Sequence, residues 1–221
     1  ELRARGVRTV VIDPRMTPDA AKATVWLPIR PGTDVALQLC WVRYILEHKL
    51  YNAAFVMKWT NLPYLVNTQT GECWRAAKST QKGVPDTFMV WDQKTNRPQP
   101  LPYPWDDALD PALEGSWEWD GVVYKTGYQL LKERSAPYTL EETARICWLM
   151  PEKIEEAIRT FCENTPSGLC IGVATDQSPN SVQAAMGAAV IDMLMGNVEQ
   201  PGSLLQRFGT QRHVFYPGFP I

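Results

Sequence analysis

Two short apolar runs near the start of the chain organise its hydrophobic pattern. Residues 9–12 and 25–29 are rich in β-branched side chains, and each run ends in a polar segment that contains proline or glycine. Runs of this length with such boundaries are typical of buried strands rather than of helices. A connection of about a dozen residues joins them, which predicts that the two strands pair in parallel.

Apolar residues at helical spacing predict six helices in the rest of the chain. The predicted helices cover residues 34–48, 51–59, 126–134, 141–148, 151–164 and 181–195. Thr139 and Glu142 form a capping box before the fourth helix, and Pro151 suits the first position of the fifth.

Two further stretches complete the predicted fold. Residues 168–174 are apolar and short, which makes them a third strand candidate. From about residue 63 to residue 123, aromatic and β-branched runs alternate with turn residues, which predicts inserted hairpins. The sequence therefore predicts an α/β fold with a mainly parallel, Rossmann-like sheet flanked by helices and a hairpin-rich insertion.

Polar side chains follow the carboxyl ends of the predicted strands, where open α/β sheets bind their ligands. The candidates are Asp13, Pro14 and Arg15 after the first strand, Gly32, Thr33 and Asp34 after the second, and Thr175, Asp176 and Gln177 after the third. No G-x-G-x-x-G follows any of these strands, so the dinucleotide fingerprint of NAD enzymes is absent from the sequence.

Each candidate also has a purely structural interpretation. Asp34 is either a carboxylate in the first turn of a helix or an acceptor for the two N–H donors of a guanine edge. Asp13 either caps a turn or contacts a ligand, and Arg15 either contacts a ligand or pairs with Asp19. Gln177 lies either near a ligand or in a solvent-facing turn.

Composition narrows the classes of function. The 221 residues are 45% hydrophobic and 21% charged with a formal net charge of −2, so nothing indicates a nucleic-acid footprint. No apolar run approaches the roughly 20 residues of a membrane span. The five cysteines are widely spaced and lack any Cys-x-x-Cys, so the sequence predicts packed thiols and no local metal site.

The stretch VVIDPRMTPDAAKATVWLPIRPGTDVALQL resembles a segment of the catalytic subunits of the dimethyl sulfoxide reductase family. The family pattern is a strand that ends in Asp-Pro-Arg, an Ala-Asp pair, and a strand that ends in Pro-Gly-Thr-Asp before a helix. This chain departs from the pattern at Thr24, where the family usually has Asp. The resemblance continues through residues 124–161, GVATDQ and LMGNVEQPG, with a weaker middle.

The resemblance implies a cofactor, bis-molybdopterin guanine dinucleotide with molybdenum or tungsten, and a set of contacts to it. At the matching family position, Asp34 contacts the guanosine end of one cofactor, together with Gly32 and Thr33, and Gln177 lies near the metal and pterin. The resemblance also implies a small-molecule substrate, an iron–sulfur cluster in an N-terminal part, and a partner, an iron–sulfur electron-transfer subunit. It implies an oxidoreductase, or a hydratase or transhydroxylase relative.

We expect residues 1–221 to be a partial cofactor-binding domain of a larger catalytic subunit, because residues 1–6 read as the last turn of a helix. The fragment alone is expected to be inactive. Two alternatives stay open at this point: a stand-alone mononucleotide-binding domain, and an interaction module that uses the Trp- and Pro-rich stretch as an aromatic groove.

Overall fold

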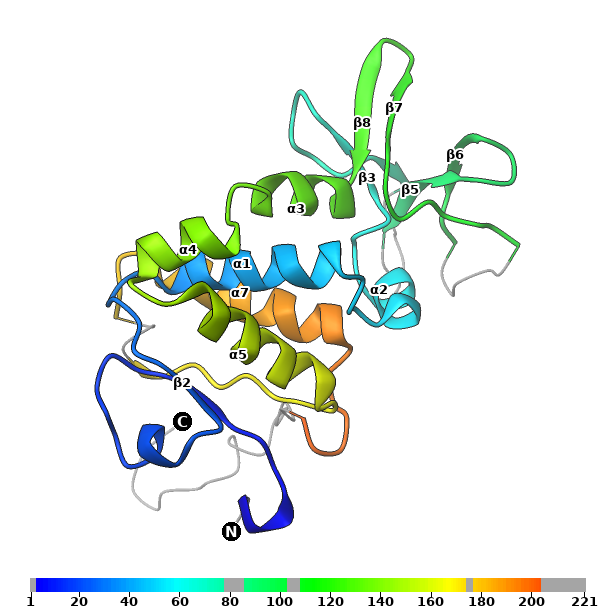
Figure 1. The fold of residues 1–221 in the computed structure, drawn as a ribbon. Helices are drawn as coiled ribbons and strands as arrows, with labels where there is room; N and C mark the ends of the chain where they lie inside the picture. Colours follow the sequence, from blue (N-terminus) through cyan, green and yellow to red (C-terminus); the bar gives the residue numbers. More distant parts are fainter. Residues whose placement is uncertain (1–2, 78–85, 103–107, 174–176, 204–221) are drawn as a thin grey trace, which may run out of the picture.

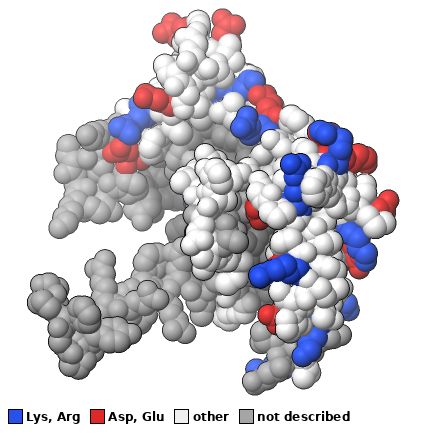
Figure 2. Space-filling model, turned by 90° about the vertical axis from the view of Figure 1, so that its left-hand side faces the viewer, with Lys and Arg blue, Asp and Glu red and all other residues white. Residues whose placement is uncertain are grey.

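The structure is a computed structural model that describes residues 3–77, 86–102, 108–173 and 177–203. A body of packed helices carries a short parallel strand pair on one side and a group of antiparallel strands at one end (Figure 1). Lys and Arg alternate with Asp and Glu over the described part of the face shown in Figure 2, without an extended area of one sign. Within the described residues, no helix is both long and apolar enough to cross a membrane.

The two predicted N-terminal strands are present and pair in parallel, as expected. Strand β1 (Val10–Ile12) places Val10 opposite Val25 of strand β2 (Val25–Leu27). A one-turn 3-10 helix, η2 (Ala20–Lys22), lies in the connection between them. Another, η1 (Arg3–Arg5), precedes β1 and is followed by Gly6 at φ +81°, a backbone conformation that glycine adopts easily.

Helices occupy each stretch in which the sequence predicted one. They are α1 (Asp34–Glu47), α2 (Ala53–Trp59), α3 (Gly127–Ser135), α4 (Leu140–Cys147), α5 (Pro151–Glu163) and α7 (Ser181–Met195). Thr139 caps α4, where the Glu142 backbone amide donates to the Thr139 hydroxyl at 3.1 Å, but the Glu142 carboxylate accepts from Arg145 and does not complete the predicted capping box. Pro151 is the first residue of α5, where its missing N–H costs no helical hydrogen bond.

Helix α1 is the centre of the helical body, because α7, α3 and α4 all pack against it. Its side chains Leu37, Trp41 and Ile45 are buried in a hydrophobic core that also contains residues of β2, α5 and α7. Gly187 permits the close approach of α7 to α1, since a Cβ at this position would lie 2.3 Å from Oε1 of Gln38 on α1. The first sheet is covered by α5 rather than extended by further strands.

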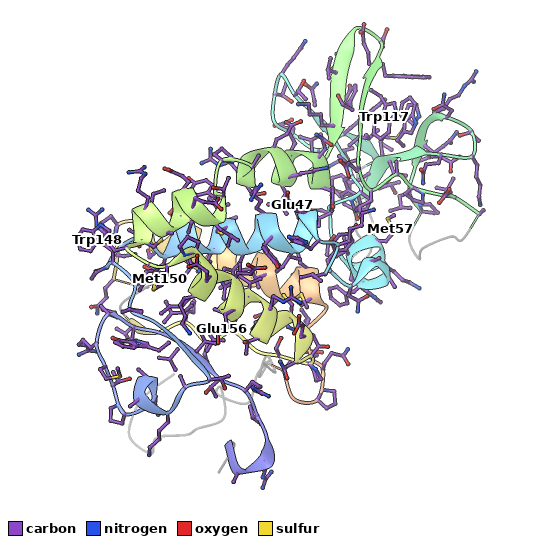
Figure 3. The ribbon with its side chains drawn as sticks, viewed as in Figure 1. Glu47, Met57, Trp117, Trp148, Met150 and Glu156 are labelled. Atoms are coloured by element: carbon purple, nitrogen blue, oxygen red, sulfur yellow. The ribbon has the colours of Figure 1, made fainter. Side chains whose placement is uncertain are left out.

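The predicted hairpin insertion is confirmed as two antiparallel sheets. Strands β3 (Leu65–Asn67), β8 (Val122–Thr126) and β7 (Ser116–Trp119) form one, and β4 (Arg75–Ala77), β5 (Thr87–Asp92) and β6 (Arg97–Pro100) form the other. Trp91 stacks on Trp117 with ring centroids 4.7 Å apart, and Trp117 marks this region in Figure 3. The tryptophans therefore build a small core for the insertion.

Two parts of the predicted fold are wrong. The α/β class holds, but the parallel sheet has two strands and the other sheets are antiparallel, so no extended Rossmann-like sheet forms among the described residues. The third strand candidate, over its described part at residues 168–173, contains no strand. The apolar side chains of Ile171 and Val173 are exposed, so this segment lacks the burial that the strand prediction assumed.

Candidate functional site

A cavity of about 870 Å³ lies beside the parallel strand pair. Its walls come from residues 5–12 around β1, one face of α1, the end of α5, and the segment at residues 164–172. Ile191 of α7 lines it as well. Cavities of 300–1,000 Å³ are the usual size of cofactor and small-ligand sites.

Three polar side chains reach this cavity from one face of α1: Asp34, Gln38 and Trp41. They are spaced by four and three residues, so they follow one another along the same side of the helix. Asp34 is the first residue of α1 and its carboxylate lies in the first turn, at the positive end of the helix dipole. The residue before it, Thr33, is the N-cap and makes no side-chain capping bond.

Two of these side chains bury a polar atom that has no hydrogen-bond partner among the described residues. They are Trp41, through Nε1, and Gln38, through Oε1. Trp41 is only 3% exposed, and its ring centroid lies 5.3 Å from that of Phe161, which also lines the cavity. A buried donor without a partner is uncommon in proteins, so the unpaired Nε1 of Trp41 is an unusual feature of this core.

The turn that precedes α1 is held in place by its own contacts. The Thr33 hydroxyl donates to the Arg30 carbonyl at 2.7 Å, and the Arg30 amide donates to the Cys147 carbonyl at 2.9 Å. Gly32 has φ +81°, which is accessible to glycine at little cost. The Arg30 guanidinium lies 4.7 Å from the ring centroid of Trp148, the exposed side chain labelled at the end of α4 in Figure 3. These contacts fix the position of Asp34 before any ligand binds.

Asp13 and Arg15 form a local turn next to the cavity but do not line it. The Arg15 amide donates to Asp13 Oδ1 at 2.8 Å, and this bond is the main reason that the pKa of Asp13 is lowered. The Trp26 indole donates to the Asp13 carbonyl at 2.8 Å. Pro14 lies between the two, exposed. The capping interpretation of Asp13 thus has a structural basis, and ligand contact by these residues stays a prediction.

Gln177 is exposed and lies in a turn, where its backbone N–H donates to the Val173 carbonyl at 3.1 Å. It does not line the cavity. Thr175 and Asp176 lie outside the described residues. The structure therefore gathers Asp34 into the cavity and leaves the other predicted contacts outside its lining.

The wall at residues 165–172 is tied to the end of α7. The Asn197 amide donates to the Ser167 hydroxyl at 2.9 Å, and the Ser167 backbone amide donates to Asn197 Oδ1 at 3.3 Å. Asp192, one turn earlier, is a partly buried carboxyl group whose pKa is raised by burial to about 6, although Asn197 and the Leu169 amide act in the opposite direction. The sequence did not predict this connection, because residues 167 and 197 carry no local motif.

Gln38 and Trp41 were not predicted as site residues either, although a signal was present. Reading α1 at intervals of four and three residues from Asp34 leads directly to them. A second cavity of about 610 Å³, lined by Trp74, Phe88 and Tyr124, lies in the insertion and contains none of the predicted site residues. No group of three or more metal-ligating side chains occurs within the described ranges.

Comparison with known proteins gives the class of this α/β chain. It is 29% identical over 212 residues to the alpha subunit of dimethylsulfide dehydrogenase from Rhodovulum sulfidophilum, a match that covers 92% of this chain and 23% of that protein. It is 33% identical over 169 residues to a Halobacterium salinarum protein described as a dimethyl sulfoxide reductase catalytic subunit, covering 76% and 20%. The structure of acetylene hydratase from Pelobacter acetylenicus matches with a TM-score of 0.56 and 23% identity, over 88% of this chain and 18% of that one. No family model matches the chain.

These relatives include dehydrogenases and reductases, and the chain spans about a fifth to a quarter of the length of the first two. The class is thus that of oxidoreductase catalytic subunits, of which this chain corresponds to one part. The chain belongs to the dimethyl sulfoxide reductase family of molybdenum oxidoreductases.

Proposed function

We propose that this chain is part of the catalytic subunit of a molybdopterin-dependent oxidoreductase and binds the guanosine end of one molybdopterin guanine dinucleotide. The observation that carries the proposal is the cavity whose α1 face begins with Asp34, at the point where the parallel strand pair leads into the helix. Family membership supplies the cofactor class, and the cavity supplies a place for its nucleotide end.

The residues present fit such a ligand in size, charge and hydrogen bonding. The cavity volume of about 870 Å³ is large enough for a nucleotide. A carboxylate with two acceptor oxygens matches the paired N–H donors of the guanine edge. Arg5 and Arg8 line the same cavity and supply positive charge suited to phosphate oxygens.

Each part of the chain then has a defined task. Asp34 accepts hydrogen bonds from the base, and Gly32 and Thr33 form the turn that places Asp34 at the start of α1. Direct ligand contact by Gly32 and Thr33, which lie outside the cavity lining, stays a prediction. Leu37 and Phe161 exclude water from the cavity, which strengthens the polar contacts made there. When bound, the cofactor supplies the metal centre for two-electron or oxygen-atom exchange, and this chain positions it.

For the whole protein we propose oxidoreductase activity on a small-molecule substrate, with electrons exchanged through an iron–sulfur partner subunit. The names of the relatives support this choice, because they include subunits of dimethylsulfide dehydrogenase and sulfite dehydrogenase. A hydratase-like reaction is favoured less, since the likeness to acetylene hydratase rests on the fold.

The experiment that tests the proposal compares two nucleotides. GDP should bind the purified protein at least tenfold more tightly than ADP in a calorimetric titration, because adenine presents a ring acceptor where guanine presents an N–H donor to Asp34. Equal affinities would contradict the role given to the cavity. Mass spectrometry of the nucleotide that copurifies with the protein then distinguishes two outcomes. A pterin dinucleotide supports the proposal, whereas GDP or GMP alone is expected of a stand-alone mononucleotide-binding domain.

A further inference from the structure

The cavity wall at residues 164–172 has no regular secondary structure (the yellow segment after α5 in Figure 1). Its backbone belongs to no helix or strand, so its N–H and C=O groups lack the partners that a ladder supplies. Among the described residues, the hydrogen bonds that tie residues 165–172 to the rest of the structure run to two side chains near the end of α7, Asn197 and Asp192. The position of the wall therefore depends on these two side chains, together with the packing of Leu169 on the core.

Asn197 connects the wall to α7 through both ends of its side-chain amide. Its Nδ2 donates to the Ser167 hydroxyl at 2.9 Å, and its Oδ1 accepts from the Ser167 N–H at 3.3 Å. The backbone N–H of Asn197 donates to the Asp192 carbonyl at 2.9 Å. Asn197 is only 2% exposed, so water has little access to compete for these bonds. Ser167, Asn197 and Asp192 thus form one connected cluster between the wall and the helix.

Asp192 is the member of this cluster that can lose a proton. Its Oδ1 is buried and has no hydrogen-bond partner among the described residues. A charged oxygen in such a place loses its hydration, so the neutral acid costs less to bury. Burial accordingly raises the pKa of Asp192 to about 6, although hydrogen bonds from Asn197 and the Leu169 N–H act in the opposite direction.

Nearby charges do not explain the raised pKa of Asp192. The charged side chains on the elements around it are Asp34, Arg43 and Glu47 of α1, Lys58 of α2, Glu199 after α7, and Arg5 and Arg8, which line the cavity. None of them is a cause of the shift, which comes from burial. Cys170, which is exposed, is the one titratable side chain within residues 164–172. The wall itself contacts the carboxyl group through Leu169, so the wall and the proton of Asp192 are coupled.

We propose that Asp192, Asn197 and Ser167 form a pH-sensitive latch, which holds the wall against α7 while Asp192 is protonated and releases the wall when the proton is lost to solvent. When residues 165–172 move away, water reaches the carboxyl group and the charged form no longer carries a burial cost. Loss of the proton therefore favours the open wall. The latch follows from the contacts of the chain itself, whereas its consequence, slower ligand release at low pH, rests on the proposed function.

Two pKa values give the pH range over which the latch opens. The carboxyl group of Asp192 has its ordinary pKa of 3.8 when the wall is open and a pKa of about 6 when it is closed. The open fraction is therefore lowest below about pH 4, rises with pH, and levels off above about pH 7. Between pH 5 and pH 8 the opening equilibrium should increase about three- to tenfold, where the lower figure allows for water that already reaches part of the side chain.

Hydrogen–deuterium exchange followed by mass spectrometry measures this opening, once the rates are corrected for the intrinsic pH dependence of amide exchange. In the wild-type protein without ligand, the corrected rates of residues 165–172 should be about three- to tenfold higher at pH 8 than at pH 5. Asp192→Asn keeps the size of the side chain and removes the titration, so its corrected rates should be equal at the two pH values. Glu199→Gln is the matched control, because it changes an exposed carboxylate two residues beyond Asn197 and should keep the wild-type pH dependence.

Three results would overturn the latch. The first is an equal corrected rate for residues 165–172 at pH 5 and pH 8 in the wild-type protein, and the second is a pH dependence that survives in Asp192→Asn. The third is exchange of residues 165–172 as slow as that of the buried amides of α1, because the wall would then open only when the whole protein unfolds.

The rate of GDP dissociation separates the latch from the proposed function. Stopped-flow measurement should show slower GDP release from Asp192→Asn than from the wild-type protein at pH 8, and equal rates at pH 5. If the wild-type protein does not bind GDP while the exchange rates behave as expected, the proposed function fails and the latch stands. If GDP binds and the wall exchanges independently of pH, the latch fails and the proposed function stands. Equal GDP release from both proteins at pH 8 would overturn the control of ligand release by the latch.

Discussion

Replacing Asp34 by Asn exchanges one acceptor oxygen for an amide donor at the start of α1. Against a guanine edge, that change removes a charge-assisted hydrogen bond and sets one donor against another. The expected cost is about 2–4 kcal/mol, or roughly 30- to 1000-fold in affinity. Asp34→Ala should cost somewhat less, because water can occupy the space that the smaller side chain leaves.

The structure also fixes what the same substitution does to the helix. Thr33, not Asp34, is the N-cap, so Asp34→Asn removes no cap and forfeits only the interaction of its charge with the helix dipole. At a partly exposed first turn this interaction contributes about 0.3–1 kcal/mol. The binding free energy for GDP should therefore change by more than the free energy of unfolding. If Asp34 were purely structural, Asp34→Asn would change only the free energy of unfolding.

Glu141→Gln is the matched control, since Glu141 is an exposed carboxylate in the first turn of α4. Glu141→Gln should show the same small loss of stability with no change in its affinity for GDP. The assay is a calorimetric titration of GDP into each variant, together with its free energy of unfolding in urea. If Asp34→Asn binds GDP as tightly as the wild-type protein does, Asp34 is a structural residue and does not contact guanine.

Three further outcomes are expected. The purified chain should contain no stoichiometric molybdenum, tungsten or iron and show no redox activity, because its described residues lack a metal-ligand set; elemental analysis with one metal per chain would contradict this. The exposed stripe of Val182, Met186 and Met193 on α7 should drive concentration-dependent self-association, weakened in Met186→Lys; sedimentation as a monomer at every concentration would refute the idea. Asp192 binds its proton more tightly when folded, so its contribution to stability is greatest below about pH 4 and falls as the pH rises through about 6. Asp192→Asn should accordingly gain about 1–2 kcal/mol over the wild-type protein at pH 8, after allowance for solvent screening, and little at pH 4.5; equal gains in urea unfolding at both values would count against it.

Local signals in the sequence predicted much of this fold because they act over short distances. Thr139 before α4 and Pro151 at the first position of α5 each specify a helix start on their own. The parallel pairing of β1 and β2 followed from the length of their connection. None of these required knowledge of distant contacts.

The errors lie where distant contacts decide. Residues 168–173 have the composition of a buried strand, but pairing and burial depend on residues that are distant in the sequence, and the side chains of Ile171 and Val173 are exposed. The candidate site shows the same division. The surroundings of Asp34 in the sequence fit a structural carboxylate at a helix start, and only the family resemblance made it a ligand candidate. The burial of Trp41 depends on residues that are distant in the sequence, so no local pattern predicts it.

The two ends of the hairpin insertion leave the helical body at one place. The Gly127 amide donates to the Tyr64 carbonyl at 3.0 Å, the Tyr128 amide donates to the Leu62 carbonyl at 2.9 Å, and Leu65 pairs with Thr126. Because the two ends of the insertion are adjacent, its length and internal fold can change without moving the helices that it connects. Evolution can therefore lengthen, shorten or exchange this module while α1, α5 and α7 keep their packing, and a short engineered turn from residue 62 to residue 127 should reconnect α2 to α3.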